Sequence, residues 1–143
     1  MAQPATPLFS PIHLLHRASQ RADGLFARRT SDLTPRQFVV LQAVMVKDGL
    51  SQTDIMAATG IDRSSTAELV RTLVKNGCLK RRRTRRDARV YAVRITPSGR
   101  QMLETGISAI GAAEGELLLP VPEKQRSVLL KLLMLLAIDP AGR

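Results

Sequence analysis

The feature that most constrains this fold is a change of hydrophobic period after residue 77. Before it, apolar residues recur at steps of three and four, as they do along one face of an α-helix. After it they alternate, so that Tyr91, Val93 and Ile95 share one face and Ala92 and Arg94 share the other. Alternation over so short a stretch is typical of a β-hairpin. The sequence therefore predicts a mostly α fold with one small hairpin, whose tip lies near residues 84–88.

Six segments around the hairpin have helical periodicity, and start and stop signals set their limits. Five of them follow a residue that commonly caps a helix, namely Ser10, Thr34, Ser51, Asp62 and Thr96. Proline stands directly after three of these caps, where its fixed backbone angle suits the first helical position. The glycines after Thr59 and Asn76 are stop signals. The predicted helices cover residues 11–30, 35–47, 52–59, 63–75, 97–118 and 122–137, although three glycines weaken the fifth.

The chain of 143 residues is long enough for one domain with a core of its own. Aromatic residues make up only 3% of it, so aliphatic side chains must fill the core, which favours packed helices. Residues 1–9 contain two prolines and lack a hydrophobic period, which predicts a flexible arm. They also lack the pattern of a secretory signal, and the longest apolar run is too short to span a membrane. We therefore expect a cytoplasmic protein with no membrane partner.

Basic residues outnumber acidic ones by 22 to 12, which gives a net charge of +10 and indicates a polyanionic partner. Many of them lie in the predicted hairpin: Lys80, Arg81, Arg82, Arg83, Arg85, Arg86, Arg89 and Arg94. Asp87 is the one acidic residue among them. So many like charges repel one another unless water or a polyanion neutralises them, and DNA does so with release of its counterions. The hairpin is therefore a candidate DNA-binding element, or else a solvated run of charge.

The two predicted helices at residues 52–75 are joined by a tight connection, which is the arrangement of a helix-turn-helix. The second helix has a polar face that suits a DNA groove, and its predicted contacts are Arg63, Ser64, Ser65, Thr66, Glu68 and Arg71. Helix N-termini attract phosphate. The predicted phosphate contacts are Ser51, Gln52, Thr53 and Lys75. An ordinary amphipathic helix with a solvated polar face is the alternative.

A basic hairpin that follows a helix-turn-helix has the position of a wing. Its predicted DNA contacts are Arg83, Arg85, Arg86, Asp87 and Arg89. An arginine at the tip can enter the minor groove, where narrow A·T-rich stretches concentrate negative potential. Arg89 is the candidate, with Asp87 orienting its side chain through a charge-assisted hydrogen bond.

In this order the residues resemble the MarR family of winged helix-turn-helix regulators over almost the whole chain. Three stretches carry the resemblance: residues 33–38 leading to Leu41, residues 50–64, and Asp87-Ala88-Arg89 through to residues 95–99. The last is similar to the wing signature of the family, with Ile95 in place of a leucine. The resemblance implies an obligate homodimer held together by residues 10–30 and 101–143. Residues 31–100 would form the DNA-binding lobe.

The resemblance also implies a transcriptional regulator that responds to a ligand. Such a repressor would release a pseudopalindromic operator when a small anionic or aromatic effector binds. By analogy, the effector would be an aromatic carboxylate or its coenzyme A thioester. The candidate effector contacts are His13, His16, Arg17, Arg21 and Phe38.

The last predicted helix has leucines on almost every side, and one small chain cannot easily bury them all. A partner chain would cover them, together with Leu15, Leu25 and Phe26 at the other end of the sequence. The alternative is that they form the core of the single chain. The two interpretations differ in what dilution does to the protein.

Several classes of function are disfavoured. One cysteine and two histidines allow no intrachain disulfide and make a metal site improbable, and we expect no cofactor. Peroxide-sensing relatives use a cysteine in the first helix, where this chain has none, so Cys78 is expected to be a small buried residue. No nucleophile and base stand at a usable spacing, which argues against an enzyme. A basic architectural or RNA-binding protein and a winged-helix protein-interaction module stay open as alternatives.

Overall fold

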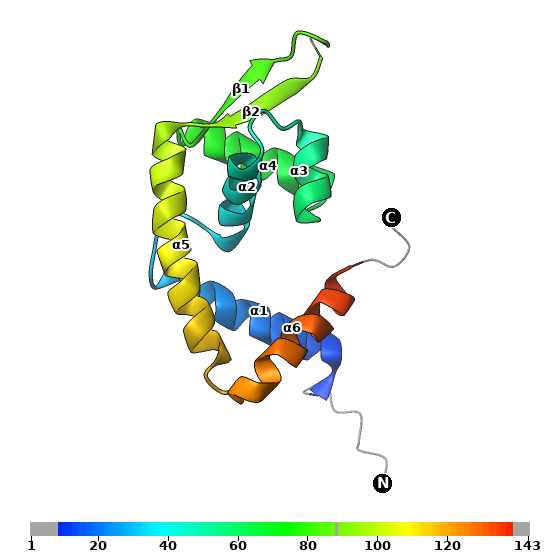
Figure 1. Ribbon diagram of the computed structural model, residues 1–143, viewed down its shortest axis with the longest axis vertical. Helices are drawn as coiled ribbons and strands as arrows, with labels where there is room; N and C mark the ends of the chain where they lie inside the picture. Colours follow the sequence, from blue (N-terminus) through cyan, green and yellow to red (C-terminus); the bar gives the residue numbers. More distant parts are fainter. Residues whose placement is uncertain (1–8, 88, 139–143) are drawn as a thin grey trace.

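The computed structural model describes residues 9–87 and 89–138, and Figure 1 shows their arrangement. The elements follow in the order α1 (Pro11–Ala27), α2 (Pro35–Val46), α3 (Gln52–Thr59), α4 (Arg63–Lys75), β1 (Leu79–Arg83), β2 (Tyr91–Ile95), α5 (Pro97–Leu118) and α6 (Glu123–Ala137). The prediction of a helical fold with one hairpin is confirmed. The arm predicted at residues 1–9 lies outside the described residues, except for Phe9.

The helices begin where the capping signals predict. Thr34 and Gln37 form a complete capping box, in which Gln37 N donates to Thr34 Oγ1 at 3.2 Å and Thr34 N donates to Gln37 Oε1 at 2.9 Å. Ser51 and Asp54 form a second box at the start of α3. Ser10 precedes α1 but makes no capping hydrogen bond through its side chain. Helix α1 ends at Ala27, three residues before the predicted position, and no glycine or proline marks this end in the sequence.

The wing consists of β1 and β2, paired antiparallel from Leu79 opposite Ile95 to Arg83 opposite Tyr91. Val93 and Ile95 are buried, as their alternation predicts. A further contact extends the sheet by a single residue: Val93 N donates to the carbonyl oxygen of Leu50 at 2.7 Å. This bridge ties the wing to the start of α3. The sequence does not signal it, because one isolated residue has no period.

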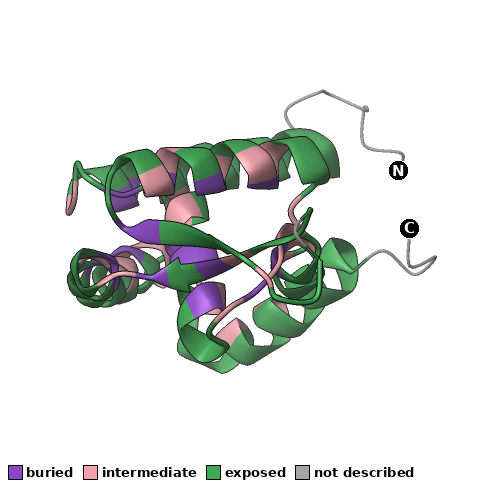
Figure 2. Ribbon diagram, turned by 90° about the horizontal axis from the view of Figure 1, so that it is seen from above, coloured by how far each residue is buried: buried purple, intermediate pink, exposed green. Residues whose placement is uncertain are grey.

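The core lies where α2, α3, α4 and the base of the wing meet, and Figure 2 shows buried positions gathered in the middle of the molecule. The rings of Phe26 and Phe38 pack at 6.4 Å between centroids and connect α1 to this core. Leu25 and Phe26 are only 3% and 2% exposed within the single chain. The expectation that a partner chain buries these two residues is therefore wrong. Leu15 is 43% exposed and is not covered by its own chain.

Helix α5 contains four glycines and runs unbroken past the three that the sequence marks as weak points, of which Gly106 has a clear packing role. A Cβ atom on Gly106 would lie 2.6 Å from Cδ2 of Phe38 and 2.8 Å from Cδ2 of Leu33. Helix α5 can therefore approach α2 and the preceding loop only because residue 106 has no side chain. Gly111 and Gly115 have no described neighbour within 4 Å of such an atom.

Helices α1 and α6 lie at the end of the molecule opposite the wing (Figure 1). Helix α6 contains no buried residue, and its large exposed apolar side chains are Val128, Leu130, Leu132, Leu133, Met134, Leu135 and Leu136. Within residues 9–87 and 89–138, no helix has both the length and the apolar character needed to cross a membrane. No cluster of three or more metal-binding side chains occurs in the same residues.

Candidate nucleic-acid interface

The starts of α3 and α4 and both strands of the wing line one groove of about 500 Å³. We call it the basic groove, and its lining residues are Ser51, Gln52, Thr53, Arg63, Ala67, Val70, Arg71, Arg81, Arg89, Val90, Tyr91 and Val93. Four of these described residues are arginines and none is acidic. The fold therefore brings segments up to about forty residues apart in sequence into one positively charged surface.

The turn between α3 and α4 fixes the relative position of these two helices. Gly60 has a φ of 72°, a left-handed conformation that glycine adopts without strain. Thr59 Oγ1 donates to the carbonyl oxygen of Ile55 at 2.7 Å and accepts from Ile61 N at 3.2 Å. Gln52 Nε2 donates to the carbonyl oxygen of Arg63 at 3.3 Å and so links the first turns of α3 and α4. The two helix starts consequently face the same groove.

Asp62 caps α4 and controls the two serines that follow it. Its carboxylate accepts from Ser65 N at 2.9 Å, from Ser65 Oγ at 2.8 Å and from Ser64 Oγ at 2.9 Å. These bonds, led by the one from the Ser65 backbone, lower the pKa of Asp62 to about 2. Each serine hydroxyl therefore donates its only hydrogen to Asp62, so that toward DNA it can act only as a hydrogen-bond acceptor. Phosphate oxygens are acceptors, so these serines suit the amino groups of bases rather than the backbone.

Among the other DNA contacts predicted on α4, the prediction for Thr66 is wrong. This residue is fully buried, and its Oγ1 donates to the carbonyl oxygen of Ile61 at 3.3 Å. Thr66 stands four residues before buried Val70 on the inner face of the helix, which explains why it cannot reach DNA. Arg63, Glu68 and Arg71 are exposed, and the two arginines line the basic groove.

The tip of the wing is organised by its own hydrogen bonds. Thr84 Oγ1 donates to the carbonyl oxygen of Asp87 at 2.9 Å and accepts from Asp87 N at 3.2 Å. Asp87 Oδ1 accepts from the backbone N of Arg89 at 2.9 Å. The expectation that Asp87 pairs with the Arg89 side chain is therefore corrected: the carboxylate holds the backbone of the tip. Residue 88, between them, lies outside the described residues.

The remaining predicted wing and phosphate contacts divide into two groups. Ser51, Gln52, Thr53 and Arg89 line the basic groove, although the Ser51 hydroxyl donates to Asp54 Oδ2 at 2.8 Å. Hydrogen bonds from Ser51, first from its backbone, also lower the pKa of Asp54. The second group, which is exposed outside the groove lining, comprises Lys75, Arg83, Arg85 and Arg86. Of these, Arg83 lies over the Tyr91 ring, 5.7 Å from its centroid.

Two polar residues of the basic groove, Arg81 and Tyr91, are absent from the predicted contacts, as are its four apolar lining residues. Strand alternation carries the signal for Arg81, because it follows buried Leu79 by two residues and so shares its face. Tyr91 precedes buried Val93 by two residues and lies on that same face. Both could have been found by extending the inward face of the hairpin beyond its apolar residues.

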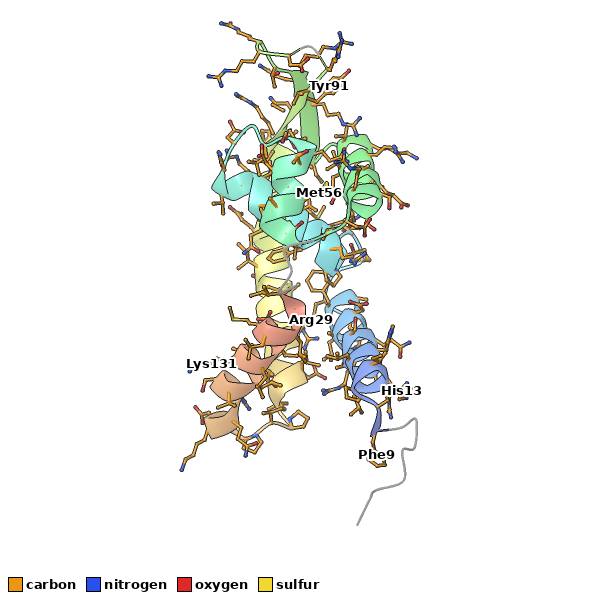
Figure 3. All side chains as sticks on the ribbon, turned by 90° about the vertical axis from the view of Figure 1, so that its right-hand side faces the viewer. Phe9, His13, Arg29, Met56, Tyr91 and Lys131 are labelled. Atoms are coloured by element: carbon orange, nitrogen blue, oxygen red, sulfur yellow. The ribbon has the colours of Figure 1, made fainter. Side chains whose placement is uncertain are left out.

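The five candidate effector contacts do not form one site in the described chain. His13, His16 and Arg17 are exposed on α1, and Figure 3 shows His13 at the opposite end of the molecule from Tyr91. Arg21 instead caps the end of α5, donating to the carbonyl oxygen of residue 117 at 3.0 Å. Phe38 is 4% exposed and belongs to the core.

A separate pocket of about 420 Å³ lies between the end of α1, the loop after it, the start of α2 and one residue of α4. We call it the inter-helix pocket, and it is lined by Asp23, Phe26, Ala27, Thr30, Ser31, Leu33, Thr34, Pro35, Arg36 and Leu69. It combines an aromatic ring and aliphatic side chains with hydroxyls, the guanidinium of Arg36 and the carboxylate of Asp23, so its two charged groups are of opposite sign. A pocket of this composition can hold a small ring that carries an anionic group.

One acidic residue near the end of α5 joins this helix to α1. Glu116 accepts from Arg28 Nη2 at 3.1 Å and from Arg29 Nη2 at 2.6 Å. The hydrogen bond from Arg29 is the main cause that lowers the pKa of Glu116. Arg21 donates to a backbone carbonyl of the same turn. Three arginines thus hold the end of α1 against the end of α5.

Comparison with known proteins identifies the family. A sequence model of the MarR family matches residues 31–90, which include the helix-turn-helix and most of the wing. A protein of Thauera aromatica, described as a transcriptional regulatory protein for the hcr operon, is 30% identical over 122 residues. The match covers 83% of this chain and 74% of that protein. The chain belongs to the MarR family.

Solved structures of other regulators share the fold of this MarR-family chain. BpsR of Bordetella bronchiseptica has 27% identity and a TM-score of 0.87 over 96% of this chain and 99% of its own. That structure concerns the regulation of BpsR binding to DNA by 6-hydroxynicotinic acid. The transcriptional repressor CouR, solved with a 23-mer DNA duplex, has 26% identity and a TM-score of 0.83 over 96% of this chain and 99% of its own.

These findings confirm the predicted family and the predicted winged helix-turn-helix. The MarR-family chain is a DNA-binding transcriptional regulator and not an enzyme. The two alternatives left open by the sequence, an architectural or RNA-binding protein and a protein-interaction module, are set aside by this result.

Proposed function

We propose that this MarR-family regulator is a repressor that places α4 in the major groove of its operator and Arg89 in the adjacent minor groove. One observation carries the proposal: the basic groove joins the exposed face of α4, the start of α3 and the wing in one surface, and none of its described lining residues is acidic. Arginine contacts of this kind provide most of the affinity, and base edges provide the specificity. Because its target is genomic DNA, we expect the protein in the cytoplasm.

The functional form in this proposal is a homodimer that binds a pseudopalindromic operator. The exposed leucines of α6 support it, since Leu135 and Leu136 are 73% and 69% exposed in the single chain. Ile12 on α1 is 71% exposed at the same end of the molecule. Apolar surface on this scale marks an interface. A two-fold dimer through α1 and α6 would present two wings to successive turns of one duplex.

The effector in this proposal is a small aromatic carboxylate that binds in the inter-helix pocket. Phe26 offers a ring surface there, and Arg36 offers the cation that a carboxylate needs. Leu69 brings the recognition helix α4 into the wall of the same pocket, so a bound ligand would contact α1, α2 and α4 together. The response of BpsR to 6-hydroxynicotinic acid supports this ligand class. If the effector is a coenzyme A thioester of such an acid, its coenzyme A portion would have to extend outside the inter-helix pocket.

Fluorescence anisotropy with labelled duplexes from the protein's own promoter region tests the DNA-binding mode. We expect tight binding to one duplex, and Arg89→Ala should weaken it by about 1–3 kcal/mol and reduce the preference for A·T-rich flanks. Arg100→Ala provides the control, because Arg100 is exposed on α5 and does not line the basic groove. Equal binding by wild type and Arg89→Ala would refute the minor-groove contact.

A thermal-shift screen with aromatic carboxylates, beginning with 6-hydroxynicotinic acid, tests the effector proposal. A compound that raises the melting temperature should also release the duplex in the anisotropy assay. Arg36→Ala should abolish both responses, while DNA binding without ligand stays intact. His16→Ala is the comparison, since His16 is exposed on α1 outside this pocket. If His16→Ala loses the response and Arg36→Ala keeps it, the effector site lies on α1 instead.

A further inference from the structure

Arg81 occupies the groove-facing side of β1. It pairs with buried Val93 on β2, and buried Leu79 precedes it by two residues on the same face. Arg82 pairs with Ala92 and belongs to the opposite face of the same strand. Arg81 and Arg82 are therefore both exposed to water but lie on opposite faces of the wing. Of the two, only Arg81 lines the basic groove.

The guanidinium groups around the basic groove have no anionic partner in the described part of the chain. Those of Arg63, Arg71, Arg81 and Arg89 form neither an ion pair nor a hydrogen bond with any described residue. The side chains that do form ion pairs lie elsewhere: Arg28 and Arg29 near α5, and Arg94 beside Asp48. Four like charges around one groove favour occupation by an anion.

The geometry of duplex DNA defines what that anion must be, if α4 and the wing tip dock as proposed above. Adjacent major and minor grooves are separated by one sugar-phosphate backbone. With α4 in the major groove and Arg89 in the minor groove, this backbone has to pass between the recognition helix and the wing. The basic groove is the space between them. We propose that Arg81 contacts a phosphate of this backbone, with Arg71 on the other side of the groove.

This role differs from that of the wing tip. A phosphate contact positions the protein on the duplex and adds the same binding free energy at every sequence, whereas a contact in a groove depends on the bases. Arg81 therefore contributes affinity and salt dependence but no sequence preference. The expected ligand is the phosphodiester backbone of duplex DNA.

The test compares Arg81→Ala with Arg82→Ala in the full-length protein. Affinities for an operator duplex and for a duplex of unrelated sequence are measured by anisotropy over a series of salt concentrations. Arg81→Ala should weaken binding to both duplexes by the same factor, at least roughly tenfold, and lower the salt slope by about 0.9 for each phosphate that it leaves without a cation. Arg82→Ala should cost roughly twofold or less, because Arg82 lies on the face of the wing away from the basic groove and acts on DNA only through screened long-range attraction. Far-UV circular dichroism checks that both variants fold.

Arg89→Ala and Arg63→Ala separate this inference from the proposed docking. If these two weaken binding while Arg81→Ala and Arg82→Ala behave alike, the role of Arg81 is refuted and the docking stands. If neither weakens binding, the docking itself is refuted. An effect of Arg81→Ala that is confined to the operator duplex would show a base contact and would likewise overturn the phosphate assignment. Arg81→Lys should recover most of the salt slope, since a lysine also neutralises a phosphate.

Discussion

Replacement of Gly99 by alanine tests how closely α5 must approach the base of the wing. A Cβ atom at this position would lie 2.8 Å from Cγ1 of Ile95 and 3.0 Å from the carbonyl carbon of Cys78, and closer still to the oxygen of that carbonyl. Two of these three neighbours are backbone atoms, which cannot rotate away. Either the first turn of α5 or the start of β1 must therefore move.

The cost of this movement can be estimated from the bonds around the Cys78 carbonyl oxygen. It accepts from Thr96 N at 3.0 Å, and displacement weakens this hydrogen bond. The Thr96 hydroxyl lies 3.1 Å away but donates its one hydrogen mainly to the nearer carbonyl oxygen of Gly77. Overpacking costs about 1–3 kcal/mol, and each weakened hydrogen bond costs about 0.5–1.5 kcal/mol. The higher helix propensity of alanine returns up to about 1 kcal/mol. The net expectation is a loss of about 1–4 kcal/mol, a large part of the stability of a typical domain.

Urea denaturation followed by circular dichroism measures this loss, at one protein concentration because a dimer unfolds in a concentration-dependent way. Gly111→Ala is the matched control. It lies on the same helix with no described neighbour within 4 Å of an added Cβ, so it should gain about 0.5–1 kcal/mol. If Gly99→Ala is as stable as wild type, the close approach of α5 to the wing does not constrain this fold, and the reasoning fails.

Three further predictions concern the cap of α4, the link between α1 and α5, and the apolar face of α6. The pKa of Asp62 is lowered to about 2, so its stabilisation of α4 is complete above an unfolded-state pKa near 3.8 and is lost as the pH falls towards 2. Asp62→Asn should therefore reduce the loss of helicity between these two pH values. An acid-unfolding profile identical to that of the wild type would contradict this role. Glu116→Gln should weaken the contact of α1 with α5 and make the melting temperature less sensitive to added salt. If the salt dependence of the melting temperature is unchanged, the ion pairs of Arg28 and Arg29 with Glu116 contribute nothing to stability. Leu135→Glu should produce a monomer, measured by light scattering, whereas the control Ser127→Glu should remain a dimer. A dimer in both variants would refute an interface through this face of α6.

The elements of this fold were predictable wherever their signals are local. Thr34 and Ser51, two of the predicted caps, each form a capping box with the residue three positions later. The left-handed φ of Gly60 and Gly77 follows from the lack of a side chain at each stop signal. The buried face of β2 follows from its alternation, whereas β1 has only Leu79 buried and does not alternate. The end of α1 was missed by three residues because no glycine or proline marks it.

The partners of apolar side chains could not be predicted, because periodicity shows which face is apolar and not what covers it. On α1 the same stripe contains Leu15, 43% exposed, and Phe26, 2% exposed. The difference is tertiary: residues 11–20 of this helix are all exposed, whereas Phe26 near its C-terminal end meets Phe38 of α2. A sequence pattern assigns both residues to one surface, whereas the structure divides them between the core and the exposed end.

Long-range polar contacts limited the prediction of the site in the same way. Arg21 was a candidate for an effector, yet it caps a helix end that lies 96 residues away in sequence. The charge of the wing and its place after the helix-turn-helix are local features, and they predict Arg89 as a DNA contact; in the structure Arg89 lines the basic groove. To predict Arg81, one further step is needed: the inward face of strand β1 has to be continued beyond its apolar residue.

The two serines of α4 show how a local cap can restrict recognition. A hydroxyl has one hydrogen to donate, and Asp62 takes it from both Ser64 and Ser65. In the major groove only the adenine N6 and cytosine N4 amino groups donate to such an acceptor. While the cap is intact, these serines can therefore read adenine or cytosine but cannot bind phosphate or the oxygen of guanine. Phosphate binding at this end of α4 would then depend on the free backbone N–H groups of its first turn and on the guanidinium groups of the basic groove. The low pKa of Asp62 keeps this division in force across the whole physiological range of pH.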